Sequence, residues 1–201
     1  MVQKIALEGL PIGQKTLSLQ SMDVETHSGE QALWYAIRVT YNREMKVKQE
    51  LDSLGIKNFV PMQYHAIVRQ GRLVKKLMPS VHNLIFIHIE PSRMKQYKAS
   101  TRLPIRYIMN RERRRPVTVP QRQMDSFIAV AGTCDEQLIY LNPDPGDFSH
   151  GDRVRILGGP FEGAEGVFVR VKGDRHVVVM IEGVVAVATT HVHPSLLQKL
   201  D

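Results

Sequence analysis

Apolar and polar residues between positions 33 and 132 follow spacings that predict strands and helices in alternation. Leu33–Val39 alternates as a strand does. Asn83–Ile89 is apolar on both faces apart from His88, which is typical of a central strand covered on both sides. Ile105–Met109 predicts a further strand. A strand that is covered on both faces implies helices packing over a sheet. Residues 33–132 are therefore predicted to form an α/β (α+β) domain.

Residues between the predicted strands repeat apolar side chains at helical spacing. Asn42 is placed to cap a first helix and Gly55 to end it. Pro91 opens a second helix, where the missing N–H of proline costs nothing, and Pro120 starts a third. The side chains expected to face inward are Val47, Leu51 and Leu54, then Met94 and Tyr97, then Met124, Phe127, Ile128 and Ala131.

Glycines punctuate alternating apolar residues from Gly151 to Val169, at the spacing of a small, tightly turned β-barrel. Gly163 and Gly166 suit backbone positions that need a positive φ or a bulge. The strands expected are Val154–Leu157, one that begins near Glu165, His176–Ile181 and Val184–Thr189. A module of this kind binds partners and does not catalyse.

Changes in composition divide the chain into four parts. Residues 1–30 show no sustained apolar period and are predicted to be a flexible extension. Residues 31–132 form the N-terminal domain and 151–201 the barrel. The stretch between them, 133–150, contains Asn-Pro-Asp-Pro-Gly-Asp and is predicted to be a semi-extended linker.

The charge of the chain favours a polyanionic partner. The 201 residues carry a formal net charge of +7, and the pI is about 9.6. Lysine and arginine bind phosphates and release counterions. The single cysteine, Cys134, excludes an internal disulfide framework and fits a reducing compartment. The sequence shows no membrane-spanning run and no signal peptide, so a cytoplasmic protein is expected.

The sequence offers no catalytic constellation. His191 and His193 have no cysteine or acidic ligand nearby at metal spacing, so no metal site is expected. Gly158–Gly163 lacks the Gly-Lys-Ser/Thr ending of a nucleotide-binding loop. Cys134 has no adjacent base to activate it. We therefore expect neither an enzyme nor a cofactor.

Two stretches resemble parts of one known family. Residues 151–169 resemble the KOW motif, an RNA- and protein-binding barrel found in ribosomal proteins and in NusG-type transcription elongation factors. Leu33–Val39, Phe59–Met62 and Pro79–Ile89 resemble the N-terminal domain of NusG proteins in order and spacing. The resemblance spans residues 31–199 and is greatest to specialised antiterminators, the RfaH and UpxY groups. It implies an antiparallel sheet with helices, followed by a small SH3-like barrel.

The resemblance also implies a surface that binds RNA polymerase. His82, Leu84 and Phe86 share one face of a predicted strand. In NusG proteins, this strand contributes to an apolar surface that grips a coiled coil of the polymerase. Arg38 and Leu84 stand where aromatic residues are usual in the RfaH group, and Arg38 is counted with this surface. The alternative interpretation is that Leu84 and Phe86 are ordinary core residues.

Nucleic acid is the second partner expected from the resemblance, which places Thr101 and Arg102 beside the displaced non-template DNA strand. A second basic group surrounds Gly71 in a predicted hairpin tip, where flexible cations suit phosphate contacts; its members are Arg69, Arg72, Lys75 and Lys76. A solvated charged loop is the alternative for this group. The cluster of Arg111 and 113–115 is expected to be an exposed loop, with nascent RNA or upstream DNA as candidate partners.

For the barrel, the resemblance suggests a partner contact at an exposed Phe161 and the neighbouring Glu162. A ribosomal protein or a termination factor is the candidate partner. In the alternative, Phe161 folds back over the barrel core. The function implied is transcription antitermination or elongation, of specific long operons such as capsular polysaccharide loci. An RNA-binding or ribosome-associated protein that uses the same barrel is the alternative.

Overall fold

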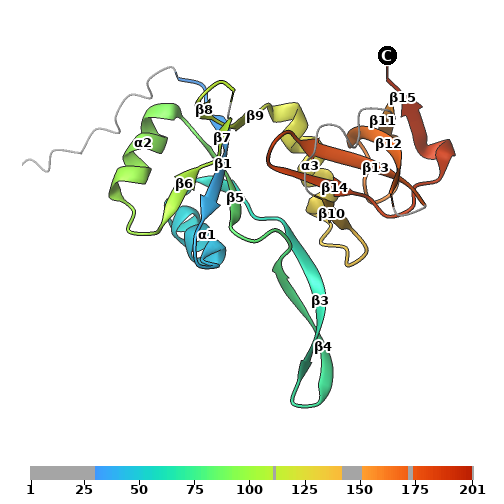
Figure 1. Cartoon of the computed structure of the whole chain (residues 1–201), viewed down its shortest axis with the longest axis horizontal. Helices are drawn as coiled ribbons and strands as arrows, with labels where there is room; N and C mark the ends of the chain where they lie inside the picture. Colours follow the sequence, from blue (N-terminus) through green and yellow to red (C-terminus); the bar gives the residue numbers. More distant parts are fainter. Residues whose placement is uncertain (1–29, 111, 142–150, 172–173, 201) are drawn as a thin grey trace, which may run out of the picture.

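The computed structural model describes residues 30–110, 112–141, 151–171 and 174–200 (Figure 1). Its N-terminal sheet has the strand order β2-β5-β1-β6, and β9 pairs with β1 as well. All neighbouring strands in it are antiparallel. The strands are β1 (Leu33–Val39), β2 (Lys57–Phe59), β5 (Leu84–Ile89), β6 (Ile105–Tyr107) and β9 (Thr118–Val119).

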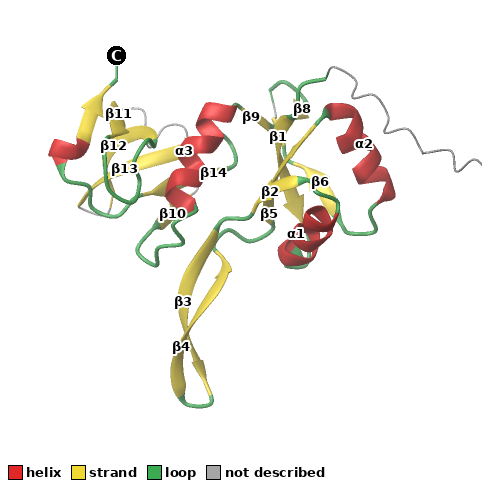
Figure 2. Ribbon diagram, turned by 180° about the vertical axis from the view of Figure 1, so that it is seen from behind, coloured by secondary structure: helices red, strands yellow, loops and turns green. Residues whose placement is uncertain are grey.

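Helices cover both faces of this sheet (Figures 1 and 2). Helices α1 (Glu44–Ser53) and α2 (Pro91–Ser100) pack on one face, where Val47, Leu51 and Met94 are fully buried. Helix α3 (Gln121–Ala131) packs on the other face. Successive residues of β1 point to opposite faces, so Trp34 and Ala36 contact the α3 side while Tyr35 and Ile37 contact the α1 side.

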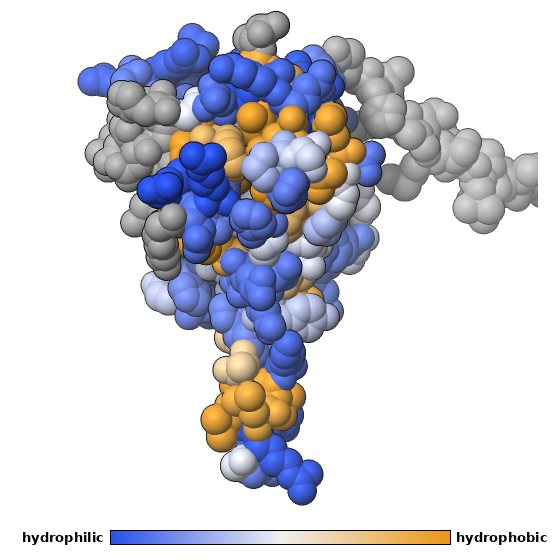
Figure 3. All heavy atoms as spheres, turned by 90° about the vertical axis from the view of Figure 1, so that its right-hand side faces the viewer, coloured by the Kyte–Doolittle hydropathy of each residue, from blue (hydrophilic) through white to orange (hydrophobic). Residues whose placement is uncertain are grey.

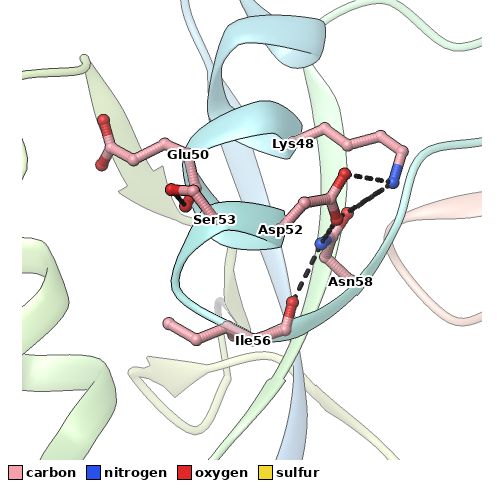
Figure 4. Close-up of polar contacts among 6 residues, drawn as sticks. All are labelled: Lys48, Glu50, Asp52, Ser53, Ile56 and Asn58. Atoms are coloured by element: carbon pink, nitrogen blue, oxygen red, sulfur yellow. Dashed lines mark hydrogen bonds and ion pairs between the residues drawn. The ribbon is translucent and has the colours of Figure 1, made fainter.

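A group of polar contacts fixes the end of α1 against β2 (Figure 4). Lys48 forms an ion pair with Asp52 at 3.0 Å, one helical turn away. The amide of Asn58 donates to Asp52 at 2.8 Å and to the carbonyl of Ile56 at 2.9 Å. Asn58 and Lys48 therefore lower the pKa of Asp52. The side chain of Glu50 points away from this group (Figure 4), and its carboxylate accepts a hydrogen bond from Thr101.

A long hairpin projects from the body of the protein (Figures 1 and 2). It consists of β3 (Met62–Arg69) and β4 (Arg72–Pro79), which pair along their full length and with no other strand in the described part of the chain. Gln70 and Gly71 form its turn, with φ angles of 51° and 74°. Two positive φ values are typical of the type I′ turn, whose twist matches that of the strands it joins. A smaller hairpin pairs β7 (Met109–Asn110) with β8 (Arg115–Pro116).

The C-terminal strands form a second antiparallel sheet in the order β10-β14-β13-β12-β11-β15. Its inner face surrounds an apolar core that includes Val177, Val179, Ile181 and Val187. Apart from β10, the elements are β11 (Asp152–Ile156), β12 (Glu165–Val171), β13 (Asp174–Ile181), β14 (Val185–Ala188), a 3-10 turn (Pro194–Leu196) and β15 (Leu197–Lys199). This all-antiparallel unit is consistent with the small barrel expected from the sequence.

Two glycines of the C-terminal sheet have the backbone roles expected of them. Gly163 has a φ of 83°, which a residue with a side chain rarely adopts. A Cβ at Gly166 would lie 2.5 Å from the carbonyl oxygen of Val178, so β12 and β13 approach too closely for any other residue.

One strand of the second sheet comes from the stretch expected to be a linker. Strand β10 (Ile139–Leu141) pairs with β14, where Ile139 lies opposite Ala188 and Leu141 opposite Ala186. These residues pack on a small buried cluster formed by Val178 and the two alanines. The rest of the Pro- and Gly-rich stretch, 142–150, lies outside the described residues, as do 1–29 of the expected extension.

The α+β N-terminal sheet with helices and the C-terminal antiparallel unit confirm the fold class expected from the sequence. Two local expectations are wrong. Asn42 does not cap α1, because its φ of 50° places it in the turn before the helix, and Arg43 occupies the cap position. Leu54 is 50% exposed, because α1 ends at Ser53 and Leu54 has left its buried face.

Candidate functional site

Leu84 and Phe86 lie in the middle of the sheet face that α3 covers. Their side chains are 3% and 0% exposed. The ring of Phe86 lies edge-on to Phe127 of α3, with 5.5 Å between ring centroids. The apolar surface expected here is therefore inside the protein, because the amphipathic α3 buries its own apolar side chains against it. The structure places Leu84 and Phe86 as ordinary core residues, which was the alternative interpretation.

Arg38 and His82 lie at the exposed rim of the same face. Arg38 is the β1 residue opposite Leu84 on β5 and opposite Arg106 on β6. His82 belongs to the turn before β5, not to the strand, and borders a cavity of about 270 Å³ shared with Tyr140. Arg38 and Arg106 face each other with like charge, an unfavourable pairing that an anionic partner would relieve.

Helix α3 also contacts the C-terminal sheet, so it lies between the two halves of the protein (Figures 1 and 2). Arg122 of α3 forms an ion pair with Glu165 of β12 at 2.6 Å, and Arg155 binds the same carboxylate at 2.6 Å. The backbone N–H of Glu165 donates to Ser126, and Gln123 donates to the carbonyl of Met180. These contacts border a cavity of about 470 Å³.

Acid is expected to weaken the contact between α3 and the barrel. Arg122, assisted by Arg155, holds the pKa of Glu165 below its usual value of 4.5. A carboxylate whose pKa is lowered by folding stabilises the protein above its unfolded pKa, and this stability is lost as pH falls through the folded value. Glu165→Gln should therefore lower the urea midpoint at neutral pH but not well below pH 4.5. An equal difference at both pH values would show that charge is not the cause.

Thr101 and Arg102 lie at the C-terminal end of α2. The Thr101 hydroxyl donates to a carboxylate oxygen of Glu50 at 2.6 Å, and it accepts from the N–H of Leu103. Thr101 therefore holds the end of α2 against α1, and its hydroxyl is already engaged. Arg102 is exposed to solvent and free to contact a ligand.

Two of the four basic residues expected at the hairpin tip lie there. Arg69 and Arg72 pair across the end of β3 and β4, next to the turn. Lys75 and Lys76 lie further along β4, and Lys75 forms an ion pair with Glu136 at 2.9 Å. The hairpin extends away from α2, so the structure does not bring these cations together with Arg102 (Figure 1).

Phe161 is not exposed, contrary to the expectation for the barrel. Its side chain is 2% exposed and belongs to the barrel core. The backbone of its turn folds back through a bond from the N–H of Ala164 to the carbonyl of Phe161. Glu162 beside it remains exposed. Of the two residues expected to meet a partner, only Glu162 presents its side chain to solvent.

The arginine-rich loop forms the turn between β7 and β8. Residues 113–115 are exposed, and Arg111 lies outside the described residues. Within the ranges that the structure describes, no three His, Cys, Asp or Glu side chains are grouped so as to hold a metal ion. None of the helices there is long and apolar enough to cross a membrane.

The N-terminal half of the chain matches a known protein family. Residues 32–128 match the family model described as transcription termination factor nusG. These residues form a NusG-family domain. The match covers β1 to α3, the elements that build the N-terminal sheet and both of its helical layers. NusG-family transcription factors are not enzymes, so the match confirms the expectation of a non-catalytic protein.

A solved structure described as "Domain interaction in Thermotoga maritima NusG" is similar to this chain. The sequences are 22% identical, and the match covers 85% of this chain and 98% of that one, with a TM-score of 0.42. No curated protein matches the sequence.

Two features of the structure were missed from the sequence. The pairing of Arg122 with Glu165 joins residues far apart in the chain, and the sequence carries no signal of it. The exposed apolar side chains of the hairpin left only a partial signal, since Tyr64 lies between polar residues but Ile67 interrupts the alternation before Val68. The basic residues of the same stretch predicted a phosphate contact and no apolar one.

Proposed function

We propose that this protein is a transcription elongation and antitermination factor that binds RNA polymerase through its NusG-family domain. The family match over residues 32–128, on a domain with the expected sheet and helices, is the observation that carries this proposal. The net charge of +7 supports action beside nucleic acid. Binding alone shifts an equilibrium between paused and processive polymerase if the processive state is bound more tightly.

The rim of the sheet is the part of the expected polymerase surface that is open to a partner. Arg38 and His82 are exposed there, whereas Leu84 and Phe86 contribute from beneath α3 by shaping the face. A contact at the rim needs no movement of α3. In this proposal, polymerase carboxylates pair with Arg38, because its neighbour Arg106 adds to the positive potential.

Non-template DNA is proposed to bind at the end of α2, in a manner that depends on Arg102. Because Thr101 is bonded to Glu50, the backbone that carries Arg102 is held in place. Arg102→Ala should weaken binding to the single strand of an assembled transcription bubble. If Arg102 contacts one phosphate, the slope of log affinity against log salt should fall by roughly 0.7.

Arg170→Ala is the control for this measurement, since Arg170 is an exposed arginine on the barrel. It should leave both the affinity and the salt slope unchanged. Binding to polymerase without nucleic acid should survive in both variants. A normal slope in Arg102→Ala would remove Arg102 from the DNA contact.

The barrel is proposed to recruit a second partner, such as a ribosomal protein or a termination factor, through the exposed Glu162. Phe161 supports this turn from inside the core. The resemblance of the chain to specialised antiterminators supports a role in particular long operons, such as capsular polysaccharide loci, and a cytoplasmic location. On the other face of the hairpin, Lys76 is proposed to reach DNA or nascent RNA near the polymerase.

Purified components test the proposal against its alternative. The full chain should bind core RNA polymerase in a direct binding assay, and it should increase transcription through a terminator on a template with its own recruiting sequence. Binding to ribosomes with no measurable binding to polymerase would favour the ribosome-associated function and overturn the proposal.

A further inference from the structure

One face of the β3–β4 hairpin is apolar and open to solvent. Tyr64 pairs with Leu77 across the strands, and Val68 pairs with Leu73, which places all four on the same face. The pair between them on that face is Ala66 with Lys75. Val68 and Leu73 are 73% and 74% exposed, and Tyr64 and Leu77 are 46% and 40% exposed. We call these four residues the hairpin apolar face. Figure 3 shows apolar side chains gathered on the projecting hairpin above a hydrophilic tip.

Val68 and Leu73 are among the three most exposed large apolar side chains of the described residues. A hairpin of two strands is marginally stable in water unless something packs on it. Nothing in the described part of the chain pairs with β3 or β4 besides each other. Contiguous exposed apolar side chains rimmed by polar residues mark interaction sites in soluble proteins. The hairpin apolar face therefore calls for a partner outside the described chain.

The base of the hairpin is firmly attached, which keeps this face in a fixed direction. The buried amide of Gln63 donates to the carbonyls of Asp135 and Leu138, each at 2.9 Å. The N–H of Tyr64 donates to the carbonyl of Cys134. These bonds join the hairpin to the loop between α3 and β10. A surface held in place before binding loses little entropy on binding.

The charge around the face indicates the chemistry of the partner. Residues 62–79 contain no aspartate or glutamate. Lys75 lies on the face between its two apolar pairs, and Arg69 and Arg72 lie beyond its outer end. His65 pairs with Lys76 on the opposite face. A matching partner has apolar side chains with carboxylates beside them. Duplex nucleic acid would satisfy the cations but keeps its bases stacked inside, so it gives the four apolar side chains little to contact.

We infer that the hairpin apolar face docks on an apolar, carboxylate-bordered protein surface of RNA polymerase. This inference rests on the proposed function, and it locates a contact of that function. The apolar residues expected to bind polymerase, Leu84 and Phe86, are buried, whereas Val68 and Leu73 are accessible without any rearrangement. Aliphatic and aromatic anchors that become fully buried supply most of the affinity of protein interfaces.

The test replaces Val68 and Leu73 together by threonine. Threonine is β-branched and favours strands, so the hairpin should persist while its apolar contact is lost. Binding to core RNA polymerase without nucleic acid should become about 10-fold to 100-fold weaker. The control is the double variant Leu54→Thr and Leu157→Thr, whose side chains are 50% and 51% exposed on other elements. It should bind as the wild type does.

Backbone amide shifts of residues 62–79 report whether the hairpin is intact in each variant. If the threonine pair alters those shifts, Tyr64→Thr with Leu77→Thr repeats the test nearer the attached base. Wild-type affinity of an intact hairpin variant for polymerase overturns the inference but leaves the proposed function standing. The same result with reduced binding to a forked DNA assigns the face to nucleic acid. Failure of the wild-type chain to bind polymerase overturns both.

Discussion

Replacing Phe86 by alanine is expected to remove a large part of the stability of the N-terminal domain. The ring is fully buried and packs against Phe127 of α3. Truncating a buried phenylalanine to alanine costs about 3–5 kcal/mol, because the transfer energy is lost and a cavity remains. A typical domain is stable by only about 5–15 kcal/mol. Urea unfolding followed by circular dichroism should therefore show a large fall in the midpoint.

Two further variants separate packing from partner contact. Phe86→Leu keeps much of the volume and should cost far less than Phe86→Ala. Leu84→Asp places a carboxylate in the same apolar interior and should prevent folding of the domain. If Phe86→Ala unfolded at the wild-type midpoint and yet failed to bind polymerase, Phe86 would be a contact residue and the packing seen here would not hold in solution.

The C-terminal residues are expected to form the β-structure even when detached from the N-terminal domain. Strands β12 and β13 are rich in valine, whose branched side chain loses rotamer freedom in a helix and packs well on a sheet. Gly163 and Gly166 further oppose a helix. Far-ultraviolet circular dichroism and amide shifts of a fragment 148–201 should report strands. Helical shifts across Val167–Ile181 would contradict this expectation.

The length of that fragment should matter, because β10 belongs to the same sheet. A fragment that begins at residue 137 retains β10, whereas one that begins at 148 leaves β14 as an edge strand. The shorter fragment also uncovers Val178 and Ala188, on which Ile139 packs. We expect it to be less stable by on the order of 2 kcal/mol. Equal stability of the two fragments would show that β10 adds nothing to the fold.

Much of the fold follows from local patterns, and the sequence predicts those parts well. Strand β1 has the bounds expected, Leu33–Val39, because its alternation is a property of neighbouring residues. Helix α3 likewise follows from its apolar spacing after Pro120. The prediction that Asn42 caps α1 failed for a physical reason. The side chain of Asn83 accepts a hydrogen bond from the N–H of Asn42 and holds Asn42 in the turn.

Contacts between distant residues account for what the sequence did not predict. Whether Leu84 faces a partner or α3 depends on which element covers the sheet, and the alternation of the strand is the same in both cases. Strand β10 is short, and its pairing with β14 depends on a partner more than forty residues away. The candidate site was predicted best for exposed charges such as Arg102, whose accessibility needs no long-range packing.

Strand β10 also limits how far the barrel can travel. The seven residues 132–138 between α3 and β10 span at most about 25 Å when fully extended. If β10 left the sheet, the tether from α3 to β11 would comprise the twenty residues 132–151 and reach at most about 70 Å. The same loop carries the carbonyls of Asp135 and Leu138 that hold Gln63. A partner that moved the barrel away from α3 would therefore first strain the hydrogen bonds of Gln63 at the base of the hairpin.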